Sequence, residues 1–156
     1  MENESLDSAA QPIPVAHTRH TELTLDQIGT MQMGLARLMR EYGERFWSCY
    51  YAAKSGNWRL AIYMINNIQK LHEYGKQTRP KMAPWLDQFE QEHLIPLKNL
   101  LKKEDWALFE KAYHHAVEGA NSLHDELGYP YIHWELPPHA PENLRMDPPS
   151  SIDSSQ

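Results

Sequence analysis

The chain has 156 residues, of which 41% are hydrophobic and 23% are charged, a composition typical of one globular domain. A net charge of -6 without a Lys/Arg stripe disfavours binding to nucleic-acid phosphates, and no apolar stretch is long enough for a signal peptide or a membrane span. We therefore expect a cytoplasmic protein with neither nucleic acid nor membrane as a partner. Cys49 is the only cysteine, which excludes an internal disulfide and a cysteine-based zinc site.

Residues 1–23 are polar and contain two prolines, so we expect a flexible N-terminal tail. The first helix is predicted to start at Thr24, because Gln27 follows three residues later as in a capping box. Trp47 and Tyr51 lie off the apolar side of this helix, and we expect them to face another helix or a partner. The apolar side itself is one stripe at helical spacing, made of Ile28, Met31, Leu35, Met39, Tyr42, Phe46, Cys49, Tyr50 and Ala53.

Two further helices are predicted before residue 103. Gly56 suits the left-handed position after the first helix, and Asn57 suits the N-cap of the second, which should end near Gly75. Pro84 is well placed in the first turn of a third helix. Pro96 is expected to kink that helix, because proline lacks the N–H that an α-helix needs.

The fourth helix is predicted to begin near Asp105, whose charge suits a helix N-terminus, and to stop at Gly128. Six of the 11 prolines lie from Pro130 onward, which argues against a fifth long helix. Residues 129–136 are rich in aromatic side chains and are expected to pack across one end of the helices as an extended strap. Beyond Pro137 the composition predicts a polyproline-like stretch and then a disordered tail.

Together these segments predict an all-α protein, an antiparallel four-helix bundle with an extended Pro-rich C-terminal strap. The expected boundaries are a tail over residues 1–23, the bundle over 24–128, and the strap and disordered tail over 129–156. The connections between the helices are short, which favours antiparallel neighbours.

His124 lies on the apolar side of the fourth helix, so its imidazole is expected to point into the bundle. A neutral imidazole in that position is a suitable axial ligand for haem iron. Ala120 would leave space for a flat guest, and three aromatic residues would contact it: Tyr50, Trp106 and Tyr113. The alternative is a core histidine that is hydrogen-bonded to a tyrosine or to a backbone carbonyl, and both readings stay open at this stage.

Four motifs in this order carry a family resemblance: Asn57-Trp58-x-Leu60-Ala61, Phe109-x-x-Ala112-Tyr113, Asn121-x-x-His124 and Gly128-x-Pro130-x-Ile132. With a Pro-rich end, residues 25–148 resemble a group of small four-helix-bundle mono-haem c-type cytochromes. The resemblance implies haem beside the last helix, with His124 as the proximal metal ligand. Ala120 and Leu123 replace the two thioether cysteines of that family. Covalent haem c is therefore excluded, which leaves non-covalent haem b or a descendant without haem.

A histidine-based metal site is a separate interpretation, which the spacing does not favour. Glu90-x-x-His93 matches one half of the carboxylate/histidine motif of di-iron bundles, but a second half is needed. His115-x-x-Glu118 has the reversed order, and His115 is expected on the solvent side. Solvent exposure is the expected explanation for most of the set His72, His93, His114 and His115.

The leading functional prediction is a cytochrome-like bundle that binds haem b or another flat hydrophobic or aromatic ligand beside His124. An open axial position on such a haem would allow redox or oxygen-activating chemistry. The second prediction is a bundle without cofactor that acts as a protein-interaction or scaffold module, through a protein partner or as a homodimer. An enzyme that uses no cofactor is a third alternative, and no residue pattern singles it out.

Overall fold

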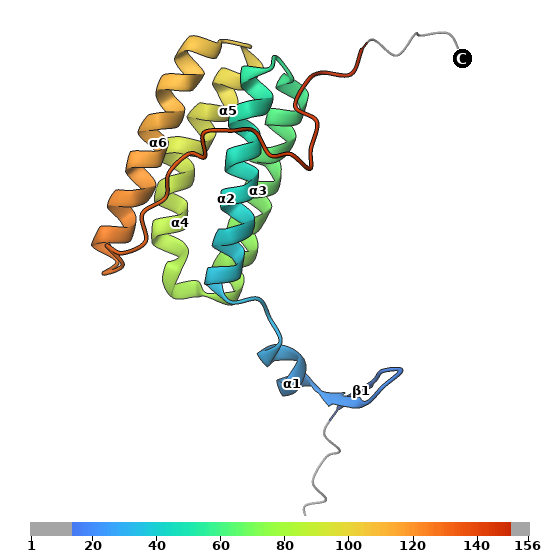
Figure 1. The fold of residues 1–156 in the computed structure, drawn as a ribbon. Coiled ribbons are helices and arrows are strands. Elements are labelled where there is room, and N and C mark those ends of the chain that lie inside the picture. Colours follow the sequence, from blue (N-terminus) through green and yellow to red (C-terminus); the bar gives the residue numbers. More distant parts are fainter. Residues whose placement is uncertain (1–13, 151–156) are drawn as a thin grey trace, which may run out of the picture. The chain divides into compact units, whose positions relative to one another are not determined.

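The computed structural model describes residues 14–150. They form two compact units, of which the first ends at Met33 and the second begins at Gly34. These residues are mostly helical, which confirms the predicted helical class, and they include a two-stranded sheet that was not predicted (Figure 1). Within residues 14–150, no helix is long and apolar enough to cross a membrane. The outer parts of both predicted tails, residues 1–13 and 151–156, lie outside the described residues.

The N-terminal unit contains a β-hairpin where the sequence predicted a flexible tail. Strands β1 (Val15–His17) and β2 (Glu22–Thr24) pair antiparallel, and the N–H of Thr18 donates to the Thr21 carbonyl at 2.8 Å across the turn. The tail prediction is therefore wrong for these residues. Each strand has only three residues, which is too short for an alternating pattern of apolar and polar residues to be recognised in the sequence.

The capping box at Thr24 is confirmed, although the helix that it starts is short. The N–H of Gln27 donates to Thr24 Oγ1 at 3.2 Å, and the N–H of Thr24 donates to Gln27 Oε1 at 2.8 Å. Helix α1 (Leu25–Thr30) then stops, and α2 (Leu35–Lys54) begins after Gly34. The prediction of one continuous helix is wrong because the intervening turn has no packing to hold it, with Met31 63% exposed.

In the helical unit, residues 34–150, α2 and α3 (Trp58–Thr78) lie side by side (Figure 1). Gly56 between them has φ +76°, and Asn57 Oδ1 accepts the N–H of Leu60 at 3.2 Å. The predicted stop and restart is therefore confirmed. The helix extends slightly past its predicted end at Gly75, and the Arg79 N–H donates to the Gly75 carbonyl at 2.8 Å.

The third helical stretch combines a 3-10 turn, two α-helices and a π turn in continuous order. These are η1 (Pro80–Met82), α4 (Ala83–Phe89), the π turn η2 (Glu90–Leu94) and α5 (Ile95–Lys102). Pro84 lies in the first turn of α4, as predicted. The π turn takes the place of the expected kink at Pro96, because proline cannot complete the α-helical hydrogen bond at that position.

The last helix, α6 (Trp106–Glu126), has the predicted ends. Asp105 Oδ1 accepts the N–H of Leu108 at 3.0 Å, and Gly128 adopts a left-handed φ of +82°. The interior between α2, α3, α5 and α6 is closed by large buried side chains, which include Phe46, Ile65, Ile68, Leu97, Leu101, Phe109 and Tyr113.

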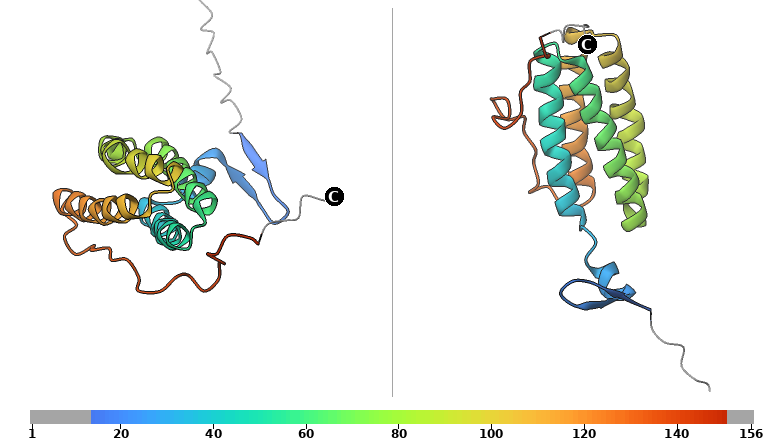
Figure 2. Two further views of the ribbon diagram at one scale, coloured as in Figure 1. Left: turned by 90° about the horizontal axis from the view of Figure 1, so that it is seen from above. Right: turned by 90° about the vertical axis from the view of Figure 1, so that its right-hand side faces the viewer.

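After Gly128 the chain turns back as an extended segment, residues 129–147, which we call the strap. It passes outside α6 and α2 along the side of the helices, rather than across one end as predicted (Figures 1 and 2). Residues 137–147 are extended, in line with the polyproline-like stretch predicted beyond Pro137, and they pack on the helices. Pro141 and Met146 are buried, and Asn57 Nδ2 donates to the Asp147 carbonyl at 3.3 Å.

Candidate functional site

Three of the predicted ligand-contacting residues lie together in the core. The ring centroid of Tyr50 is 5.3 Å from that of Trp106 and 4.9 Å from that of Tyr113. Tyr113 is fully buried, its ring stacks on Phe46 at 4.2 Å, and its hydroxyl donates to the Phe46 carbonyl at 2.9 Å. The Tyr50 hydroxyl donates to Glu110 Oε1 at 2.8 Å. Both hydroxyls are therefore already used by the protein itself.

Both phenols are also held in their protonated form. Burial raises the pKa of Tyr113, and it raises the pKa of Tyr50 to about 12 with help from the hydrogen bond and charge of Glu110. Neither group can accept a proton at neutral pH. Their chemistry is that of hydrogen-bond donors inside a packed core.

His124 is not part of this aromatic cluster. Tyr113 lies about three turns earlier on α6, roughly 16 Å along the helix axis. The His124 ring is partly exposed, and its Nδ1–H donates to the Ile132 carbonyl at 2.9 Å. The expected orientation into the interior is therefore wrong. Of the alternative, the bond to a backbone carbonyl is present, but the ring is not in the core. Ala120 is half-buried and packs against the core.

A haem at His124 would need both a free imidazole nitrogen and a slot beside it. The bond from Nδ1 to Ile132 leaves Nε2 as the unprotonated nitrogen, an arrangement common among metal-bound histidines. The slot is the difficulty. Two open hollows border the strap, and His124 lines neither of them. The residues around His124 therefore offer no slot for a haem in either hollow.

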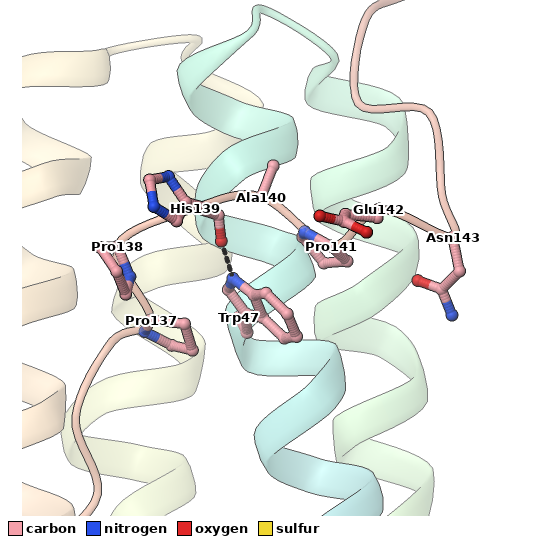
Figure 3. Close-up of a pocket in the computed structure, with 8 residues that line it drawn as sticks. All are labelled: Trp47, Pro137, Pro138, His139, Ala140, Pro141, Glu142 and Asn143. Atoms are coloured by element: carbon pink, nitrogen blue, oxygen red, sulfur yellow. Dashed lines mark hydrogen bonds between the residues drawn. The ribbon is translucent and has the colours of Figure 1, made fainter.

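Trp47 and Tyr51 of α2 face the strap and bind its backbone. Trp47 Nε1–H donates to the His139 carbonyl at 2.7 Å, as Figure 3 shows, and the Tyr51 hydroxyl donates to the Pro137 carbonyl at 2.8 Å. Both residues contact the C-terminal segment of the same chain instead of the other helix or the partner that was predicted.

Asn121 of α6 holds the strap nearer its start. Its Nδ2 donates to the Trp134 carbonyl at 3.0 Å, and its Oδ1 accepts the Trp134 N–H at 2.9 Å. We call Trp47, Tyr51 and Asn121 together the strap face. All three side chains bind backbone atoms of the strap. These contacts therefore depend on the extended backbone conformation of the bound chain more than on the identity of that chain's side chains.

An open hollow of about 420 Å³ lies between Trp47 and residues 137–143 of the strap (Figure 3). Its lining is largely apolar in character, because it consists mainly of the indole and the proline rings of Pro137, Pro138 and Pro141. A second hollow, of about 540 Å³, lies between α6 and residues 133–136. The strap thus leaves space on both sides of its contacts with α2 and α6.

A buried polar cluster surrounds the π turn, and helical spacing alone does not predict it. His72 is 1% exposed, with Nδ1 3.6 Å from Glu90 Oε2, and its ring stacks on Tyr42 with centroids 5.4 Å apart. Within residues 14–150, Tyr42 Oη and His72 Nδ1 have no hydrogen-bond partner. Gln69 Nε2 donates to Glu90 Oε1 at 2.9 Å. Burial lowers the pKa of His72 more than Glu90 raises it, so the imidazole is neutral.

His93 lies in the same π turn and faces α6. Its ring packs against Gly119, where a Cβ atom would come within 2.7 Å of His93 Cε1, and lies 5.2 Å from the His115 ring. Burial, with a smaller contribution from His115, lowers the pKa of His93. Exposure was expected for most of the four histidines considered as metal ligands, yet His72 and His93 are both buried. The only signal for this was the position of each on an apolar helix face.

Within the described part of the chain, no group of three or more His, Cys, Asp or Glu side chains is arranged to hold a metal ion. Glu90 faces His72 rather than pairing with His93 as a di-iron ligand set. Comparison with known proteins finds no matching family model, curated protein or solved structure. The resemblance to c-type cytochromes stays a prediction.

Proposed function

We propose that the helical unit is a four-helix bundle that binds a protein partner without a cofactor, and that the strap face is its contact surface. The observation that carries this proposal is the set of side-chain bonds from Trp47, Tyr51 and Asn121 to the backbone of an extended chain. Donors that bind backbone carbonyls can hold any extended chain whose carbonyls have the matching spacing. Recognition of peptides commonly works in this way.

Exposed apolar residues next to the strap face support the same proposal. Tyr131 is 78% exposed, and Tyr129, Ile132 and Leu144 are also exposed. Aromatic side chains at the surface contribute strongly to protein interfaces, because they bury a large area at a small cost in side-chain entropy. These residues belong to the strap or its first turn, so a partner on the strap face would also reach them.

Site-specific photo-crosslinking tests the contact surface. A photoreactive amino acid in place of His139 on the strap is expected to give a discrete adduct with another protein in cells that make this chain. The matched control carries the same group in place of Lys70, an exposed residue of α3. Adducts that form equally at both positions, or at neither, would overturn the proposal.

The cofactor-free part of the proposal is tested with hemin. The wild-type protein and His124→Ala are expected to give the same absorption spectrum after hemin is added, because the His124 ring has no adjoining slot in either hollow. A sharp Soret band that His124→Ala removes would instead establish non-covalent haem b, as the family resemblance implies.

A further inference from the structure

Trp47 and Tyr51 bind two carbonyls of an extended chain that crosses α2 (Figures 1 and 3). The two residues are four apart on the helix, which separates them by about 6 Å along its axis. Their donors bind the carbonyls of His139 and Pro137, two residues apart on the strap. Two donors one helical turn apart therefore bind alternate carbonyls of one extended chain.

The segment held in this way is rich in proline. Pro138 and Pro141 form a Pro-x-x-Pro pattern, and Pro137 precedes it. Proline has no N–H, so a proline-rich chain brings few unsatisfied donors to the α2 surface, and its fixed φ reduces the entropy lost on binding. The Trp47 indole lies against these prolines (Figure 3). Aromatic side chains that also donate to proline-segment carbonyls are a common means of polyproline recognition.

The middle of the strap is held less firmly than its two ends. Asn121 anchors the start through two hydrogen bonds, and buried Met146 anchors the end. Between them, Pro138 and His139 are exposed, and the main polar contacts are the single bonds to Trp47 and Tyr51. A competing chain that made the same two bonds would restore what the displaced strap loses. Pro141 is buried and Ala140 packs on the core, so exchange on α2 also requires an incoming chain that buries a proline in place of Pro141.

From these observations we infer that Trp47 and Tyr51 form a proline-rich peptide site, which the strap occupies in the free protein. The ligand is a Pro-x-x-Pro segment of a partner protein, which displaces residues 137–141 from α2. The inference rests on the proposed function and names the chemistry of its partner. The hollow of about 420 Å³ beside Trp47 gives the incoming chain room to make its first contact.

The site is tested by NMR on the full-length protein labelled with ¹⁵N, with the indole N–H of Trp47 as the probe. The added ligand is a peptide with the sequence of residues 136–143, and the control peptide has alanine in place of its three prolines. Saturable shifts of the Trp47 signal are expected with the first peptide only. Trp47→Phe removes the donor from strap and peptide alike, so its effect is measured where the strap is weakened by Pro138→Ala and Pro141→Ala. There it is expected to weaken peptide binding about fivefold by isothermal titration calorimetry, whereas the matched control Trp85→Phe should not.

A full-length variant tests the competition by the strap. Pro138→Ala with Pro141→Ala weakens the internal ligand and leaves Trp47 and Tyr51 unchanged, so the added peptide is expected to bind about tenfold more tightly than to wild type. No shift at Trp47 in this variant would overturn the inference. The crosslinking at residue 139 could still succeed in that case, which separates this failure from a failure of the proposed function. Concentration-dependent dimers that this variant loses would instead assign the site to the strap of a second copy and overturn the partner assignment.

Discussion

Helix α2 contacts the rest of the helical unit through two faces that work by different physics. Its inner face buries Phe46 and Tyr50 among core aromatics, where contact area and packing supply the stabilisation. Its outer face presents Trp47 and Tyr51, which bind the strap through one hydrogen bond each. The buried aromatic contacts are lost only when the unit unfolds. The hydrogen bonds to the strap can be replaced by equivalent bonds to another extended chain.

The comparison explains why the two faces suit different roles. A buried apolar contact loses its whole transfer free energy when it opens, roughly 25 cal/mol per Å² of area exposed. A hydrogen bond at the surface is worth only about 1 kcal/mol net, because water replaces it. Stability is therefore concentrated on the inner face, and binding of a partner fits the outer one.

The largest expected effect is on the core side of this comparison. Phe109→Ala removes a fully buried ring and is expected to lower the free energy of unfolding by about 3–5 kcal/mol, measured by urea denaturation. The matched control is Leu108→Ala, the neighbouring residue, which is 55% exposed and should change stability by about 0.5 kcal/mol or less. Equal losses in the two variants would contradict the division between core and surface.

The second largest expected loss of stability comes from the contact between α6 and the π turn. Gly119→Ala is expected to destabilise the protein by about 1–3 kcal/mol, because the new methyl group overlaps the His93 ring. Without that overlap, alanine would favour the helix by about 1 kcal/mol. Thermal unfolding of Gly119→Ala with His93→Ala should therefore show partial rescue. A destabilisation that is simply additive in the double variant would mean that His93 and Gly119 do not touch.

Acid should weaken the core around the π turn. Burial lowers the pKa of His72 and of His93 below the ordinary value of about 6.5, so both are neutral when folded. The unfolded chain then binds protons more readily than the folded one. Stability is complete above about pH 6.5 and is lost as the pH falls below it. Urea denaturation at pH 7.5 and 5.5 should show this loss, and His72→Gln with His93→Gln should reduce it.

The sequence predicted those features that neighbouring residues determine by themselves. The caps at Thr24, Asn57 and Asp105 each need only a side-chain oxygen and an N–H three residues later. Gly56 and Gly128 adopt the left-handed conformation that ends a helix. These interactions are local, so a single sequence is enough to place them.

The orientation of His124 could not be predicted in the same way. Helical spacing places His124 on the same side of α6 as Tyr113. Spacing cannot predict which other segment packs against α6 at the position of His124. Near the end of α6 the neighbour is the returning strap, and the ring bonds the Ile132 carbonyl. Tyr42 was likewise assigned only to an apolar stripe, because the position of Glu90 beside His72 depends on how α3 packs against the π turn.

The smallest expected effect is on the outer face and tests the comparison most sharply. Tyr51→Phe removes only the hydroxyl that holds the Pro137 carbonyl, so the expected loss is about 0.5–1.5 kcal/mol and local to the strap. Hydrogen exchange should become faster at the amides of residues 139–147 and stay unchanged in the middle of α6. Tyr63→Phe, at an exposed tyrosine of α3, is the matched control and should change neither region. If Tyr51→Phe accelerated exchange in α6 as well, the strap would unfold together with the core. The outer face would then be as fixed as the inner one, and no partner could use it by exchange.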